Sequence, residues 1–122
     1  MAGKKILIVD DNEDFSKLLE VKLTAEGYEV VTAPNGLEGF EKAKAQKPQL
    51  ILLDIKMPQM DGFTFVRSLK KEDAIKDIPV IMLTDFEPMR ELFQLEGIKD
   101  YFSKTGDMKI LLKTIAGKFS QD

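Results

Sequence analysis

The chain has 122 residues, with 18 Lys and Arg against 21 Asp and Glu, and it contains neither Cys nor His. This length suits one domain whose core needs no disulfide or structural metal. The missing Cys and His exclude disulfides, zinc–thiolate sites, cysteine nucleophiles and histidine bases. The formal net charge of −3 gives no general attraction to nucleic acid or membranes. No apolar run approaches the roughly 18 residues of a membrane span, and no signal-peptide pattern is present, so we expect a cytoplasmic protein.

Five short apolar runs alternate with five amphipathic segments, which predicts repeated strand–helix units. The strands are expected at Ile6–Val9, Tyr28–Ala33, Leu50–Leu53, Val80–Leu83 and Ile98–Ser103. The helices are expected to carry their apolar faces on Phe15, Leu18, Leu19 and Leu23; on Leu37, Phe40 and Ala43; on Phe63, Val66 and Leu69; on Met89, Leu92 and Phe93; and on Met108, Leu111, Leu112, Ile115 and Phe119. Gly27 and Gly97 are typical of helix ends.

The strand composition predicts the order of the sheet. Runs one, three and four are uniformly apolar, as expected of parallel strands that are covered on both faces. Runs two and five carry Glu29, Lys99 and Asp100, which is typical of edge strands. Right-handed crossovers then predict an α/β fold, a doubly wound five-stranded parallel sheet of the flavodoxin-like (βα)5 type with strand order 2-1-3-4-5. We expect a single domain over residues 1–122.

Polar side chains follow four of these strands at their carboxyl ends, where open parallel sheets form their sites. Asp10 and Asp11 follow the first strand, Asp54 the third, Thr84 the fourth and Lys104 the fifth. Three converging carboxylates with oxygen ligands favour Mg²⁺, and a hydroxyl and an ammonium beside them suit a phosphoryl group. For the Asp10–Asp11 pair taken alone, capping of the following helix explains the residues as well as metal binding does.

The chain resembles, over its full length, the receiver domain of bacterial two-component response regulators, of the single-domain, chemotaxis-regulator-like type. The matching segments are Ile6–Asn12, Leu53–Gly62, Thr84 and Asp100–Lys104. The resemblance implies a phosphoacceptor domain in phosphorelay signalling that catalyses only its own phosphoryl transfer and dephosphorylation and is otherwise not an enzyme. It implies a histidine kinase or histidine phosphotransfer protein as donor, an unknown downstream protein target, and no direct contact with nucleic acid or membrane.

The same resemblance implies roles for individual residues. Asp54 would be the phosphoacceptor, and Asp11, Asp54 and the main-chain carbonyl of Lys56 would hold Mg²⁺, with Asp10 supporting the ion through water. Further residues would act around the phosphoryl group, two as ligands of its oxygens and one as the aromatic that changes rotamer when the domain switches: Thr84, Lys104 and Tyr101, respectively. The switch would alter the surface of the fourth helix, fifth strand and fifth helix.

The chain departs from the family pattern at Asp85 and Thr105, and in the twenty positions from Thr84 to Lys104, fewer than the family usually has, which implies a short fourth helix. Asp85 stands where a small residue is usual, so it either borders the phosphoryl site or caps the following helix. Phe86 follows it, at a position that can affect the lifetime of the phosphorylated state. Thr105 replaces a proline that usually follows a cis bond, so we expect either a trans arrangement that shifts Lys104 or a strained cis bond.

These departures keep a second function open, a phosphorylation-independent pseudo-receiver that acts as a protein-interaction module. An aspartyl phosphatase or a flavin protein on the same fold is disfavoured, because the chain has no cap domain and its first loop is acidic.

Overall fold

The computed structural model describes residues 3–54, 62–83, 97–98 and 100–120. Its strands are β1 (Lys5–Val9), β2 (Glu29–Ala33), β3 (Leu50–Asp54), β4 (Val80–Leu83) and β5 (Asp100–Phe102), and its helices are α1 (Glu13–Ala25), α2 (Gly36–Gln46), α3 (Gly62–Lys70) and α5 (Met108–Ser120). The predicted fourth helix, with Met89, Leu92 and Phe93, lies outside the described residues. No helix in the described part of the chain is both long and apolar enough to cross a membrane.

All strand pairs are parallel, and the sheet order is β2-β1-β3-β4-β5, which confirms the predicted topology. The three inner strands are buried along most of their length, whereas β2 is partly exposed, as expected of an edge. Residue Val9 pairs with Leu53 in neighbouring strands. The residues that follow these two therefore emerge together at the carboxyl edge of the sheet.

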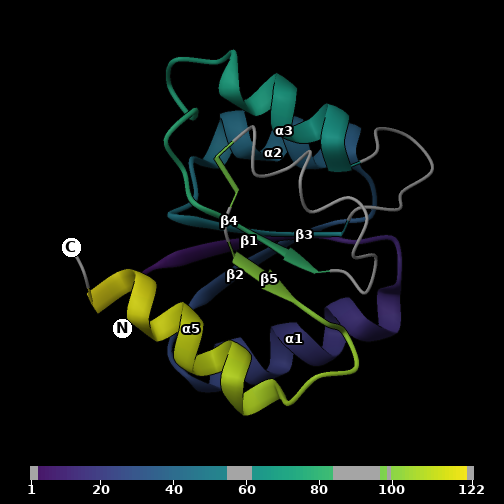
Figure 1. Ribbon diagram of the computed structural model, residues 1–122, viewed down its shortest axis with the longest axis vertical. Coiled ribbons are helices and arrows are strands. Elements are labelled where there is room, and N and C mark those ends of the chain that lie inside the picture. Colours follow the sequence, from purple (N-terminus) through teal and green to yellow (C-terminus); the bar gives the residue numbers. More distant parts are fainter. Residues whose placement is uncertain (1–2, 55–61, 84–96, 99, 121–122) are drawn as a thin grey trace.

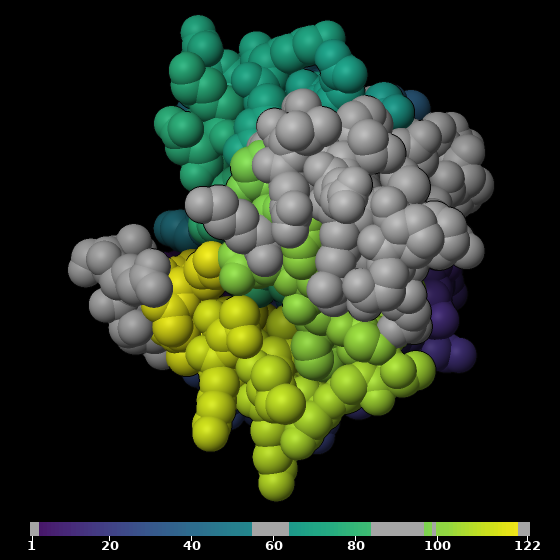
Figure 2. Space-filling model, viewed as in Figure 1, coloured from purple at the N-terminus to yellow at the C-terminus, as the bar shows by residue number. Residues whose placement is uncertain are grey.

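Helices cover both faces of the sheet (Figure 1): α2 and α3 lie on one side, α1 and α5 on the other. Alternate side chains of β1 divide between the two cores because successive residues of a strand point to opposite faces. Leu7 and Val9 pack with Phe65 on the α2/α3 side, and Ile6 and Ile8 pack in the cluster that α1 and α5 complete. Figure 2 shows α3 and α5 at opposite ends of one face of the molecule.

Local signals account for where helices begin. The Asn12 side chain accepts a hydrogen bond from the main-chain N–H of Phe15, which caps α1. The Asn35 side chain accepts a hydrogen bond from the main-chain N–H of Glu38, which caps α2, and its amide donates to the Glu38 carboxylate. Gly27 has a φ of 95° just beyond α1, in the left-handed region that glycine adopts readily. The Asn12 and Asn35 caps hold the loops that lead from the sheet edge into α1 and α2.

Two details of the predicted elements are wrong. Leu18 and Leu37 are half-exposed. The buried residues of α1 are Ser16, Leu19 and Leu23, so the helix turns Leu18 away from the core. The buried residues of α2 are Gly36, Gly39 and Ala43, which leaves Leu37 outside the buried face. Two strands are shorter than predicted: β2 begins at Glu29, after Tyr28, and β5 covers only Asp100–Phe102 of the predicted Ile98–Ser103. At the end of β5 the carbonyl of Ser103 accepts a bond from the N–H of Gly106 and closes a turn.

Candidate functional site

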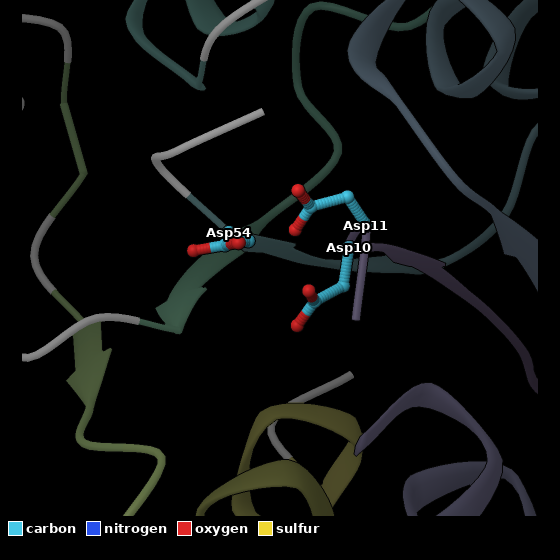
Figure 3. A group of neighbouring side chains, drawn as sticks. All are labelled: Asp10, Asp11 and Asp54. Carbon is cyan, nitrogen blue, oxygen red and sulfur yellow. The ribbon is translucent and has the colours of Figure 1, made fainter. Parts of the chain in front are cut away.

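Three carboxylates meet at the carboxyl edge of β1 and β3 (Figure 3): Asp10 and Asp11 directly follow β1, and Asp54 is the last residue of β3. Oxygen atoms from all three lie within 4.8 Å of one another. Asp10 and Asp54 are buried, whereas Asp11 is exposed. Like charges this close repel, so the cluster calls for a positive partner.

Main-chain bonds hold Asp10 from two directions. Its N–H donates to the carbonyl of Ala33 at 3.1 Å, which ties it to the end of β2. Its Oδ1 accepts a bond from the N–H of Asn12 at 2.9 Å. The second bond is an Asx turn, in which an aspartate side chain binds the backbone two residues on. The sequence signal for this bond is an Asp two residues before a main-chain N–H at the start of a helix, here Asp10 before Asn12.

Lys104 supplies a positive charge from the loop that follows β5. Its Nζ lies 2.7 Å from Asp10 Oδ2 and 3.4 Å from Asp54 Oδ2, and the Lys104 side chain is 22% exposed. Burial disfavours the charged ammonium, but the bond to Asp10 and the charges of Asp10 and Asp54 outweigh burial and raise the pKa of Lys104 above its ordinary value. Lys104 therefore stays positively charged beside the carboxylates.

A hydroxyl-bonded turn carries Lys104 to the site. The N–H of Gly106 donates to the carbonyl of Ser103 at 2.8 Å, and the hydroxyls of Ser103 and Thr105 are 2.9 Å apart. The Thr105 N–H also donates to Ser103 Oγ. Every described peptide bond is trans. The trans alternative therefore applies at Thr105, and with it the Lys104 ammonium still reaches both carboxylates.

The remaining predicted site residues differ in what the structure describes. Tyr101 is half-buried in β5 beside the α2/α3-side core, and its hydroxyl donates to the carbonyl of Ile98 at 3.1 Å. Outside the described residues lie Lys56, Thr84, Asp85 and Phe86.

The donor set of the cluster fits Mg²⁺. Carboxylate oxygens are the ligands this hard cation prefers, and thiolate and imidazole ligands are absent because the chain has no Cys or His. Among these four side chains, one ammonium faces three carboxylates, so two negative charges stay uncompensated. Asp10, Asp11 and Asp54 are the side chains that would hold a divalent cation.

Comparison with known proteins agrees with this geometry. The chain is 42% identical over 113 residues to the response regulator PleD of Caulobacter vibrioides. The aligned region covers 91% of this chain and 25% of PleD, so the chain spans only about a quarter of that relative. It is 39% identical over 113 residues to the protein PilH of Pseudomonas aeruginosa, which covers 91% of this chain and 93% of PilH. The solved structure of the response regulator TrrA from Thermotoga maritima, in complex with Mg²⁺-BeF, has a TM-score of 0.84 and 31% identity and covers 94% of this chain and 98% of TrrA.

The match extends through both edges of the sheet and both helical layers. Residues 6–116 match the response regulator receiver domain, from β1 to within α5. The chain therefore belongs to the receiver domain family of two-component response regulators.

Proposed function

We propose that this receiver domain accepts a phosphoryl group on Asp54, with Mg²⁺ as cofactor, and passes the signal on through a change in its surface. One observation carries the proposal: the Asp54 carboxylate ends a buried strand beside Asp10 and Asp11 and lies 3.4 Å from the ammonium of Lys104. Mg²⁺-BeF in the related TrrA structure supports the same chemistry for this chain.

The chemistry is a transfer from nitrogen to oxygen. An oxygen of Asp54 attacks the phosphorus of a phosphohistidine on the donor protein; the P–O bond forms, the P–N bond breaks, and the histidine nitrogen leaves with its electron pair and takes up a proton. Charge builds on the phosphoryl oxygens in the transition state, so catalysis is mainly positioning and neutralisation. Lys104 supplies one positive charge there, and Mg²⁺ when bound supplies more.

The product is an acyl phosphate, which water can hydrolyse. In that second step a water oxygen attacks phosphorus, the P–O bond to Asp54 breaks, and inorganic phosphate leaves. The chain thus catalyses only its own phosphorylation and dephosphorylation and is not an enzyme for other substrates. A histidine kinase or histidine phosphotransfer protein in the cytoplasm is the donor, consistent with the family.

The signal leaves through the β5 side of the domain. The Tyr101 hydroxyl donates a hydrogen bond to the Ile98 carbonyl. Movement of Thr84 toward the phosphoryl group would let Tyr101 leave that carbonyl and reshape the surface that a downstream protein target reads. The domain itself contacts neither nucleic acid nor membrane.

A titration with Mg²⁺ and beryllofluoride, a phosphoryl mimic, tests the proposal by two-dimensional NMR. Wild type should show saturable shifts at the amides of Asp54, Tyr101 and Lys104. The variant Asp54→Asn should lose the beryllofluoride shifts, and Asp73→Asn, a control in an aspartate whose side chain is 97% exposed, should keep them.

Two results would contradict the proposal. Shifts with Mg²⁺ alone and none on adding beryllofluoride would favour the phosphorylation-independent interaction module instead. Beryllofluoride shifts that persist in Asp54→Asn would move the acceptor to another residue.

A further inference from the structure

The Lys104 ammonium has an aromatic neighbour as well as its two carboxylates. Its Nζ lies over the ring of Phe15, 5.0 Å from the ring centroid. Phe15 belongs to α1 and Lys104 to the loop after β5, so the contact joins two segments far apart in the chain. A cation this close to the face of an aromatic ring is attracted by the negative charge of that face.

Phe15 is itself held in place. Its N–H donates to the capping side chain of Asn12 at 3.0 Å, and its half-buried side chain packs against the core cluster on the α1/α5 side. The Asn12 N–H in turn bonds Asp10. The ring is therefore anchored to the same loop that places the carboxylate, so ring and carboxylate keep a fixed relation.

The ring contact differs from the two ion pairs in one respect. A divalent cation, or a phosphoryl group on Asp54, uses the carboxylate oxygens to which Lys104 now binds. Either ligand competes with the ammonium for those oxygens, whereas the face of Phe15 offers nothing to a metal ligand or to phosphate. Contact with the ring can thus persist while the other contacts of Lys104 are exchanged.

We propose that Phe15 is a positioning residue: its ring holds the Lys104 ammonium at the carboxylate cluster, so that the ammonium is in place for phosphoryl oxygens on Asp54. The role in phosphoryl binding rests on the proposed function. The contact itself does not, because the structure places the ammonium over the ring whatever the function of the site. A lysine side chain has a flexible stem, and a second anchor reduces the orientations it must give up on binding.

The chain offers a matched control. Lys44 lies over the ring of Phe40, 4.8 Å from its centroid, and both residues are on α2. Phe40 is also half-buried and packs against the opposite core cluster, on the α2/α3 side. The substitution Phe40→Leu therefore removes the same kind of ring contact at a position outside the carboxylate cluster.

The experiment compares Phe15→Leu, Phe15→Tyr and Phe40→Leu with wild type. In the free protein, ring current should shift the ε-methylene protons of Lys104 upfield, and the shift should vanish in Phe15→Leu and remain in Phe15→Tyr. Affinity for beryllofluoride at saturating Mg²⁺ should fall roughly two- to tenfold in Phe15→Leu, the range expected when one flexible side chain must be immobilised on binding. It should stay near wild type in Phe15→Tyr and Phe40→Leu.

The outcomes separate the two proposals. Wild-type protein that binds no beryllofluoride refutes the proposed function and the phosphoryl role of Phe15 with it. Normal wild-type binding with Phe15→Leu equal to Phe40→Leu refutes only the role of Phe15, and so does a Tyr variant as weak as the Leu variant. Unchanged Lys104 ε-methylene shifts in Phe15→Leu refute the contact.

A folding defect in Phe15→Leu would not remove the test. Fluorinated phenylalanines at position 15 keep the size of the ring while weakening the negative charge of its face. Affinity for beryllofluoride should then fall with each added fluorine, and a flat series would overturn the proposal.

Discussion

Removing the Lys104 ammonium tests the electrostatics of the site. In Lys104→Met the apolar stem is kept and the charge is lost, which leaves the buried carboxylates of Asp10 and Asp54 without this cation. We expect the variant to fold with lower stability in the absence of Mg²⁺. We also expect Mg²⁺ to stabilise it more than wild type, because Mg²⁺ no longer competes with Lys104 for Asp10.

The magnitude follows from the geometry. At an effective dielectric constant of about 20, unit charges 2.7 Å apart attract by about 6 kcal/mol before the cost of burying them is subtracted. Removing one partner of a buried ion pair typically costs about 3–5 kcal/mol. We expect about 3 kcal/mol here, at the low end, because Asp10 keeps its bond from Asn12 and the Lys104 side chain is 22% exposed.

Urea unfolding at a series of Mg²⁺ concentrations measures both effects. Free Mg²⁺ at about 100 times its dissociation constant adds about 2.7 kcal/mol to the stability of a protein that binds it only when folded. The control is Lys44→Met, because Lys44 is exposed and its pair with Glu41 spans 3.7 Å. That variant should lose no more than about 1 kcal/mol and should respond to Mg²⁺ as wild type does.

Two results would refute this reasoning. A loss in Lys104→Met no larger than that of Lys44→Met would show that the Lys104 contacts with Asp10 and Asp54 contribute no more stability than an exposed ion pair. An equal response of wild type and Lys104→Met to Mg²⁺ would show that the ammonium and the metal do not compete for the same oxygens.

Three further predictions concern packing, capping and pH. A Cβ on Gly39 would lie 2.8 Å from a methyl group of buried Val9. Overpacking outweighs the gain in helix propensity there, so Gly39→Ala should lower the free energy of unfolding in urea by about 1–2 kcal/mol. A Cβ on Gly117 has nothing within 4 Å, so Gly117→Ala should raise the free energy of unfolding by about 0.5–1 kcal/mol. Equal changes in the two would contradict the packing argument. Asn12→Ala should lower the free energy of unfolding in urea by about 1 kcal/mol, because the cap on α1 is lost. An unchanged free energy of unfolding would show that the cap does not stabilise the helix. The raised pKa of Lys104 means that loss of its proton begins to cost stability only above its ordinary pKa of 10.5, and the stabilisation is lost as the pH rises through the higher folded value. The stability difference between wild type and Lys104→Met should be constant from neutral pH to about 10.5 and shrink above it. A difference that shrinks just above neutral pH would contradict the assignment.

The topology could be predicted because the sequence displays it directly. Apolar runs without alternation indicate strands covered on both faces, and such strands are parallel. Their carboxyl ends then meet at one edge, which brings Asp10 beside Asp54 without any knowledge of side-chain geometry. The predicted position of the carboxylate cluster depends on the predicted parallel sheet, because only parallel neighbours end at the same edge.

Prediction failed where a single helix position decides the environment. Leu18 and Leu19 are equally apolar, but successive helix residues point about 100° apart, so only Leu19 faces the core. Nothing in the composition of the helix marks Leu18 as exposed. The contact between Phe15 and Lys104 could not be predicted for a related reason. Phe15 reads as an ordinary apolar residue of a helix, and nothing in the sequence indicates that its ring also faces a cation from a distant loop.

The position of Lys104 shows what strand-end reasoning leaves out. Strand β5 is three places from β1 in the sheet, which at a spacing of about 4.8 Å is about 14 Å, whereas a lysine side chain reaches about 6 Å. The strand order alone therefore cannot bring the Lys104 ammonium to Asp10; the loop must carry its backbone inward. The turn closed between Ser103 and Gly106 lies at this point in the chain, and the hydroxyls of Ser103 and Thr105 hold it. Which residue stands at position 105 thus matters through the path of this loop, and a hydroxyl there is compatible with an ammonium that reaches both carboxylates.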